Sequence, residues 1–180
     1  MVITYINQDT MNIIKFVFSS LLFYIATISL QAQVVTVNKL NKEPLSSKID
    51  FVMDFSSASI HGLSEHDFAE YEPDWEKDKP TIMDAFRSKA NNVLDGAVIF
   101  GDFQKSQQTL KIKVVNIDTN GFIICDAEIV NNSGNVIFKV ENVTGGKELP
   151  ISLGTKLAMI KIWSNRVGRK FAKILKEEMK

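Results

Sequence analysis

The sequence has one cysteine, Cys125, and two histidines, His61 and His66. A single cysteine excludes a disulfide within the chain. The histidines lack the paired spacing of common metal sites, so the sequence predicts no metal and no other cofactor. Basic and acidic residues number 21 each. This balance argues against nucleic acid as a partner, because binding nucleic acid requires a concentrated basic surface.

Several motifs of enzymes are also missing. There is no G-x-S-x-G elbow, and Gly145-Gly146-Lys147 lacks the earlier glycine of a phosphate-binding loop. Cys125 falls on the apolar face of an expected strand, where a free cysteine behaves as a small hydrophobic residue. We therefore assign no catalytic residue, and the sequence favours a protein that is not an enzyme.

The first 32 residues have the pattern of a targeting segment. Lys15 precedes an uncharged apolar run over 16–30, and Ala32 is a small residue at the expected cleavage point. This order is typical of a secretory signal peptide. The run is shorter than the roughly 20 residues needed to cross a bilayer, although an uncleaved anchor is the alternative. The sequence predicts export to the periplasm or beyond, with membrane contact only before cleavage near Ala32.

Residues 1–10 precede a second methionine, Met11, and we interpret them as an upstream extension of the true start. Residues 33–180 then have the length and composition of a single domain with a substantial core. Alternation of apolar and polar residues predicts strands, and a period of three to four predicts helices. The expected strands are 49–55, 97–103, 110–118, 122–130 and 136–141. The expected helices are a short one after Ser64, one from Pro80, and one over about 154–176.

This order of elements predicts an α+β fold, a two-layer sandwich with one mixed sheet of about five strands. Strands 49–55 and 97–103 should be parallel and joined by a right-handed crossover, and the last three strands should form an antiparallel meander. The central and C-terminal helices should cover one face of the sheet. Val115 and Ile117 break the alternation of their strand, which indicates a bulge or a second covered face.

The last helix carries an apolar stripe that includes Trp163 and Phe171, which we expect in the core. Met159 and Ile162 lie outside the stripe, so the first two turns are apolar over most of their circumference. Something must cover them. We expect the acidic segment 65–78 to do so through its aromatic residues, and the alternatives are segment 34–37 or another chain.

Segment 65–78 contains seven acidic residues among Phe68, Tyr71 and Trp75, and the last helix has a basic stripe. Most such charge runs are solvated faces, and we expect these two to face each other within the domain. The other interpretation is an interaction surface with aromatic anchors. Its expected members are Tyr71, Trp75, Met159, Ile162, Arg166 and Arg169.

Three functions fit these observations. The favoured one is an exported, non-enzymatic domain that binds or scaffolds another envelope protein. The second is a hydrolase-type enzyme whose site assembles only in the folded chain around Asp50, Asp54, His61 and His66, and a deep pocket holding these residues would identify it. The third is a structural subunit that pairs through a sheet edge.

The stretches DFSSASIHGLSEHDFAEYEPDW (54–75) and DKPTIMDAF (78–86) resemble small, uncharacterised secreted proteins of Bacteroidetes-type bacteria. The resemblance covers most of 33–180 and implies no catalytic residue. The order of elements is also similar to small α/β domains of envelope proteins, such as the N-terminal domain of TolB and the lipoprotein activators of peptidoglycan synthases. That second likeness is one of topology.

Overall fold

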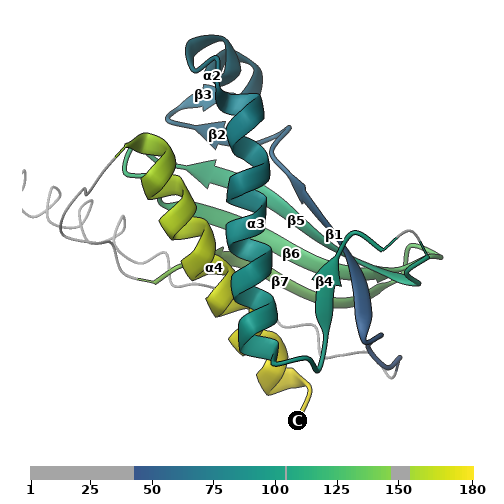
Figure 1. Cartoon of the computed structure of the whole chain (residues 1–180). Helices are drawn as coiled ribbons and strands as arrows, with labels where there is room; N and C mark the ends of the chain where they lie inside the picture. The colour runs from purple at the N-terminus through teal and green to yellow at the C-terminus, as the bar shows by residue number, and fades with distance from the viewer. Residues whose placement is uncertain (1–42, 104, 147–154) are drawn as a thin grey trace, which may run out of the picture. The chain divides into compact units, whose positions relative to one another are not determined.

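The computed structural model describes residues 43–103, 105–146 and 155–180. The predicted signal peptide and segment 34–37 lie outside these ranges. Within them the chain forms a mixed sheet of seven strands and three helices, so the predicted α+β class is confirmed (Figure 1). The strands are β1 (Lys48–Asp54), β2 (Ser59–Ile60), β3 (Leu63–Ser64), β4 (Ile99–Gly101), β5 (Gln108–Ile117), β6 (Ile123–Asn131) and β7 (Val136–Thr144). The helices are α2 (Glu65–Tyr71), α3 (Trp75–Leu94) and α4 (Lys156–Glu178).

β5 is the strand on which the sheet is assembled. β1 runs parallel to β5 along one side, and β4 runs parallel to β1 beyond it. β6 and β7 follow β5 as an antiparallel meander on the other side, as predicted. β2 pairs with the last residues of β5 on the same side as β1, and β3 pairs with β2. The predicted bulge is present between Val114 and Asn116.

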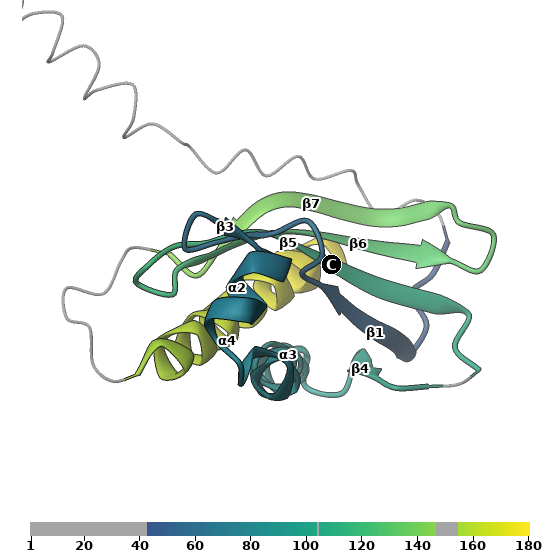
Figure 2. The same ribbon diagram turned by 90° about the horizontal axis from the view of Figure 1, so that it is seen from above.

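The helices lie on one face of this sheet, as predicted (Figure 2). Alternate residues of β5 and β6, such as Ile112 and Cys125, are fully buried beneath them. Trp163 and Phe171 of α4 are also buried, which confirms their predicted place in the core. Among the described residues, no helix is long and apolar enough to cross a membrane.

α3 and α4 run parallel to each other and approach closely. Ser164 donates a hydrogen bond of 2.6 Å to the carbonyl oxygen of Ile82. One turn later Gly168 lies against Phe86, where a Cβ atom would be only 2.4 Å from the carbonyl oxygen. Further along, Lys176 donates to the carbonyl oxygen of Val93. Small residues at the crossing therefore allow the two backbones to touch.

The segment 97–103 forms a shorter strand than predicted. β4 is short and lies at an edge of the sheet. Phe100 is buried beneath α3, whereas its neighbour Ile99 is exposed. The side-chain amide of Asn91, in α3, accepts a hydrogen bond from the Phe100 N–H (2.8 Å) and donates one to its carbonyl oxygen (2.9 Å). Asn91 thus takes the place of a further strand.

The helix predicted from Pro80 begins earlier, at Trp75. Pro80 therefore lies inside the helix, where it removes the backbone hydrogen bond to the residue four positions before it. The indole of Trp75 packs edge-on against two phenylalanine rings. Its ring centre lies 5.4 Å from that of Phe55 and 5.2 Å from that of Phe68. Burial of this large ring offsets the lost hydrogen bond, and it extends the helix beyond the position that proline usually marks.

Candidate functional site

The acidic segment 65–78 folds into a corner between the sheet and the two long helices. Ser64 caps α2 by accepting a hydrogen bond from the Asp67 N–H (3.1 Å). Phe68 and Trp75 then turn inward and are each 2% exposed. The proposed role of Trp75 in an interaction surface is therefore wrong, because its ring is part of the core.

The start of α4 faces two other parts of the chain. Phe68 and Trp75 line a hollow of about 330 Å³ together with Leu157 and Ile160, so the aromatic residues of the acidic segment face α4 across this hollow. Met159 is covered instead by the turn between β5 and β6: a Cβ atom on Gly121 would lie 3.0 Å from the Cβ of Met159. Gly121 has φ +77°, which suits glycine at this close approach.

Met159 is therefore buried and does not belong to an interaction surface, contrary to prediction. Sequence reasoning missed the Gly121 contact because a turn between two strands gives no sign of which helix it will meet. Ile162 was the other residue that required cover. It remains 40% exposed.

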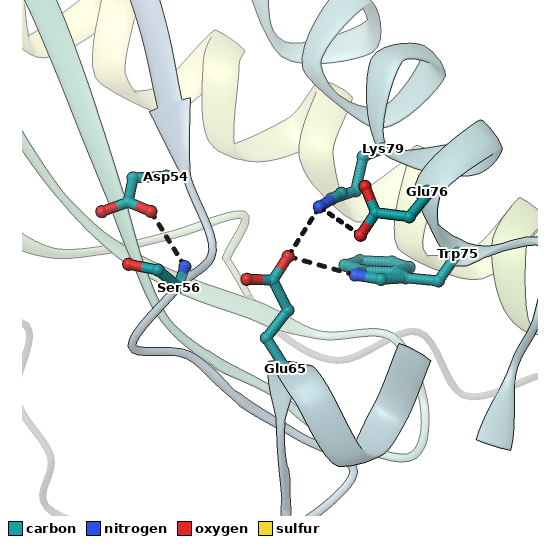
Figure 3. A network of polar contacts seen from close by, with 6 residues as sticks. All are labelled: Asp54, Ser56, Glu65, Trp75, Glu76 and Lys79. Carbon is teal, nitrogen blue, oxygen red and sulfur yellow. Dashed lines mark hydrogen bonds and ion pairs between the residues drawn. The ribbon is translucent and has the colours of Figure 1, made fainter. Parts of the chain in front are cut away.

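A partly buried polar network ties the corner to α3 (Figure 3). The Lys79 ammonium lies 2.9 Å from a Glu65 carboxylate oxygen and 2.7 Å from a Glu76 carboxylate oxygen. The same Glu65 oxygen accepts a hydrogen bond of 3.3 Å from the indole N–H of Trp75. Side-chain exposure is only 17% for Glu65 and 22% for Lys79. Glu65 therefore joins α2 to α3 through two donors.

This arrangement keeps the side chain of Lys79 protonated. Partial burial opposes the charged form, but the hydrogen bonds to Glu76 and Glu65 outweigh it and raise the pKa of Lys79. An ammonium held in this way is not a nucleophile or a general base near neutral pH. The network is suited to holding α2 on α3 rather than to chemistry on a substrate.

A hollow of about 300 Å³ lies beside this network, at the carboxyl end of β1. Asp54, Glu65, Glu76 and Lys79 line it, together with apolar side chains. Asp54 does not join the network. Its carboxylate turns to Ser56 and accepts a hydrogen bond of 2.9 Å from the Ser56 N–H, which lowers its pKa (Figure 3).

The four residues expected to form a hydrolase site are not brought together. Asp50 and Asp54 occupy different ends of β1. Four residues of a strand place them about 13 Å apart. Asp50 accepts a hydrogen bond from the Phe103 N–H (3.3 Å). His66 is exposed on α2, where its Nε2 atom lies 3.5 Å from a carboxylate oxygen of Glu70. Two catalytic carboxylates would have to flank one cleft, and these two do not.

His61 has an unusual environment. It adopts φ +53° and rests edge-on against the ring of Phe68 at 5.1 Å. Its Nε2 atom is buried without a hydrogen-bond partner in the described part of the chain. Burial, and then the positive charge of Lys156, lower the pKa of His61. The imidazole is therefore neutral near pH 7.

Cys125 is fully buried on the helix-facing side of β6, as predicted. Its burial raises the pKa of the thiol far above the usual range, with a smaller contribution from Asp126. A thiol that stays protonated is a poor nucleophile and a poor metal ligand. Within the described ranges, no three His, Cys, Asp or Glu side chains are grouped so as to hold a metal ion.

The opposite charges of the acidic segment and the α4 stripe do not face each other as expected. The acidic segment pairs with Lys156, the first residue of α4: its ammonium binds the Glu72 carboxylate and lies 4.9 Å from the ring centre of Tyr71. Arg169 lies more than three turns further along α4. The N-terminal ends of α3 and α4 lie together beside α2 (Figure 1), so the acidic segment is away from the second half of α4, which carries Arg169.

Four residues of the predicted interaction surface remain at the surface. Tyr71 is 68% exposed at the end of α2, Ile162 is exposed, Arg169 is exposed, and Arg166 is half-buried beside the Trp163 ring. Ile162 and Arg166 line a hollow of about 610 Å³ between α3 and α4, on the side away from the sheet. Its other residues are Thr81, Asp84, Ala85, Ser88, Ala158, Lys161 and Asn165.

The helix-free face of the sheet carries a further hollow, of about 570 Å³, that the sequence did not indicate. In register across the strands, Val52 pairs with Lys111, Lys111 with Glu128, and Glu128 with Lys139. Opposite charges thus alternate across this face. The outward-facing residues of each expected strand could be identified from the sequence. The order of strands that aligns their charges could not.

Comparisons with known proteins give little further information. No protein-family model matches the sequence, and no curated protein matches it. The PelC dodecamer from Paraburkholderia phytofirmans is similar in structure, with a TM-score of 0.40 and 13% identity over 76% of this chain and 96% of that chain. A point variant of the same dodecamer gives a TM-score of 0.39 and 12% identity over the same shares. Likeness of this degree supports no inference about function or assembly.

Proposed function

We propose that this protein is an exported, non-enzymatic domain that binds or scaffolds another protein of the cell envelope, in the periplasm or beyond. The observation that carries the proposal is the outer surface of α3 and α4. There an apolar side chain, Ile162, is 40% exposed in a hollow beside Arg166. Exposed apolar groups beside arginine are common in protein interfaces.

The state of the reactive groups supports a role other than catalysis. Lys79 is held by two carboxylates, Cys125 is buried as a thiol, and Asp54 is bound to the backbone of its own turn. Each of these groups contributes to the fold. The proposal therefore rests on recognition at the surface, and it names the helix layer as the recognising face.

Export is tested by the N-terminus of the native protein. Protein recovered from the host should begin close to Gln33, because the apolar run and Ala32 predict cleavage there. Mass spectrometry of the periplasmic and secreted fractions measures this. Recovery of a chain that starts at Met1 or Met11 in the membrane fraction would contradict cleavage and favour an anchor.

Binding is tested by capture of envelope proteins on residues 33–180, with two variants that are matched in chemistry. Ile162→Glu places a charge on the helix layer, and Val52→Glu places one on the opposite face of the sheet, where Val52 is 45% exposed. We expect capture to be lost with Ile162→Glu and retained with Val52→Glu. Loss with Val52→Glu alone would move the binding surface to the sheet and refute the proposal for α3 and α4.

A further inference from the structure

The charges on the helix layer are separated by the direction of its helices. α3 and α4 run parallel, so their N-terminal ends lie together at one end of the layer (Figure 1). Around that end four acidic side chains are exposed: Asp67, Glu70, Asp74 and Glu76. We call them the acidic corner. Towards the other end α4 exposes four basic side chains, which we call the basic face: Arg169, Lys170, Lys173 and Lys176.

The two sets cannot neutralise each other within one molecule. Gly168 lies against Phe86 and Lys176 reaches Val93, so the basic face lies beside the second half of α3, whereas Glu76 lies in its first turn. The helix from Glu76 to Phe86 spans about 15 Å, whereas charges are screened beyond about 8 Å at physiological salt. No ion pair within the described part of the chain involves Arg169, Lys170 or Lys173. The basic face is therefore available to another molecule.

Helix dipoles account for only part of this pattern. Acidic residues in a first turn and basic residues in a last turn are stabilised by the dipole, but the effect falls off within one turn. α4 ends at Glu178, so Arg169 and Lys170 lie two turns before its last residue. Glu70 lies near the C-terminal end of α2, where a negative charge is unfavourable. The helix dipoles therefore do not explain the charges of these residues.

We propose that the basic face docks on the acidic corner of a second copy of this chain, in a head-to-tail contact. The chain has no net charge, so two copies do not repel each other as a whole. The complementary patches are separated along the same layer. Tyr71, which is exposed within the acidic corner, offers ring surface for an arginine of the neighbouring copy. Because each copy has one patch of each sign, the contact repeats and gives a ring or a filament.

The inference names a partner for the scaffolding role proposed above, but it is tested separately, on purified protein. Sedimentation velocity of residues 33–180 should show association at about 0.02 M salt and monomers at about 0.5 M salt, because the contact is electrostatic. Arg169→Glu with Lys173→Glu should weaken association by at least about tenfold, and so should Glu70→Lys with Asp74→Lys.

The decisive measurement mixes the two charge-reversed variants. Two reversals among four charges leave the altered patch of each variant without net charge. In the mixture, the intact acidic corner of one variant can pair with the intact basic face of the other, so heterodimers should form. A control with Lys111→Glu and Lys113→Glu makes the same charge change on the open face of the sheet and should associate like the parent. Melting curves check that every variant is folded.

Three results would overturn the inference: a monomeric parent at low salt, a mixture that stays monomeric, or a control as weakened as the basic-face variant. Binding of the parent to vesicles of anionic lipid, lost with Arg169→Glu and Lys173→Glu and found without self-association, would also overturn it and assign the basic face to membranes. If the parent is monomeric, the proposal of a binding surface at Ile162 is still tested by capture. If capture fails, the self-association of this chain is still tested by sedimentation.

Discussion

Replacement of Gly168 by alanine tests whether α3 and α4 touch at their crossing. The added methyl carbon would lie 2.4 Å from the carbonyl oxygen of Phe86 and 3.0 Å from its carbonyl carbon and Cα. Ordinary contact requires about 1 Å more than the shorter distance. All three atoms belong to the backbone, so a side-chain rotation cannot relieve the overlap, and one helix must move.

Three contributions determine how much Gly168→Ala lowers the free energy of unfolding. Alanine favours a helix over glycine by about 1 kcal/mol, which opposes the loss. Forcing extra volume into a packed core costs about 1–3 kcal/mol, and a rigid backbone neighbour places this site near the upper end. Separation of the helices also weakens the hydrogen bond from Ser164 to Ile82, which contributes about 1 kcal/mol. The net expectation is a loss of about 2–3 kcal/mol.

Thermal unfolding measures this loss. For a domain of this size, 2–3 kcal/mol lowers Tm by about 6–9 °C. Arg169→Ala is the matched control, because this exposed neighbour on α4 should change Tm by about 1 °C or less. The double variant with Ser164→Ala should lose less than the sum of the two single variants, since both report the same helix separation. If Gly168→Ala melts at or above the parent temperature, the close crossing is wrong.

Four further predictions concern single residues. Asn91→Ala should lower the free energy of unfolding in urea by about 2 kcal/mol, because the edge backbone of β4 loses both hydrogen bonds; no change would show that water replaces them. Phe171→Ala should cost about 3–5 kcal/mol in the same assay, and an unaltered midpoint would contradict its burial. Cys125 should react with a thiol reagent only after denaturant is added. Stability should fall as pH drops below about 6.5, because the pKa of His61 is lowered by folding and the unfolded chain takes up the proton first; His61→Gln should flatten that slope, and an unchanged slope would assign it to other groups.

Most of the fold could be predicted from the sequence because its strands are regular. Outward Lys111 and Lys113 alternate with buried residues along β5, and the break near Val115 marks a real bulge. The last helix was also predictable, since its apolar stripe is long and continuous. Local patterns of this kind arise from burial on one face, and they are visible without knowing the neighbours.

The parts that could not be predicted depend on distant partners. Trp75 extends α3 past the usual proline boundary only because Phe55 and Phe68 receive its ring. Lys79 and Glu65 come from different helices, and nothing in their spacing indicates that they meet. Two of the six residues of the candidate surface, Trp75 and Met159, are buried for a similar reason. Residues 159 and 162 look alike on the helix, but only Met159 meets the turn at Gly121.

The position of β1 against β5 has a consequence for the order in which the chain folds. Phe51 pairs with Leu110, and the whole of α3 lies between them in sequence. During synthesis, β1 is therefore complete long before the strand that will cover its edge has been made. Contacts between such distant residues form slowly, whereas β5, β6 and β7 are joined by short turns and can pair at once. We expect the meander to form first and β1 to dock onto it last. The apolar face of β1 should therefore be the segment that is most exposed to aggregation while the chain is being made.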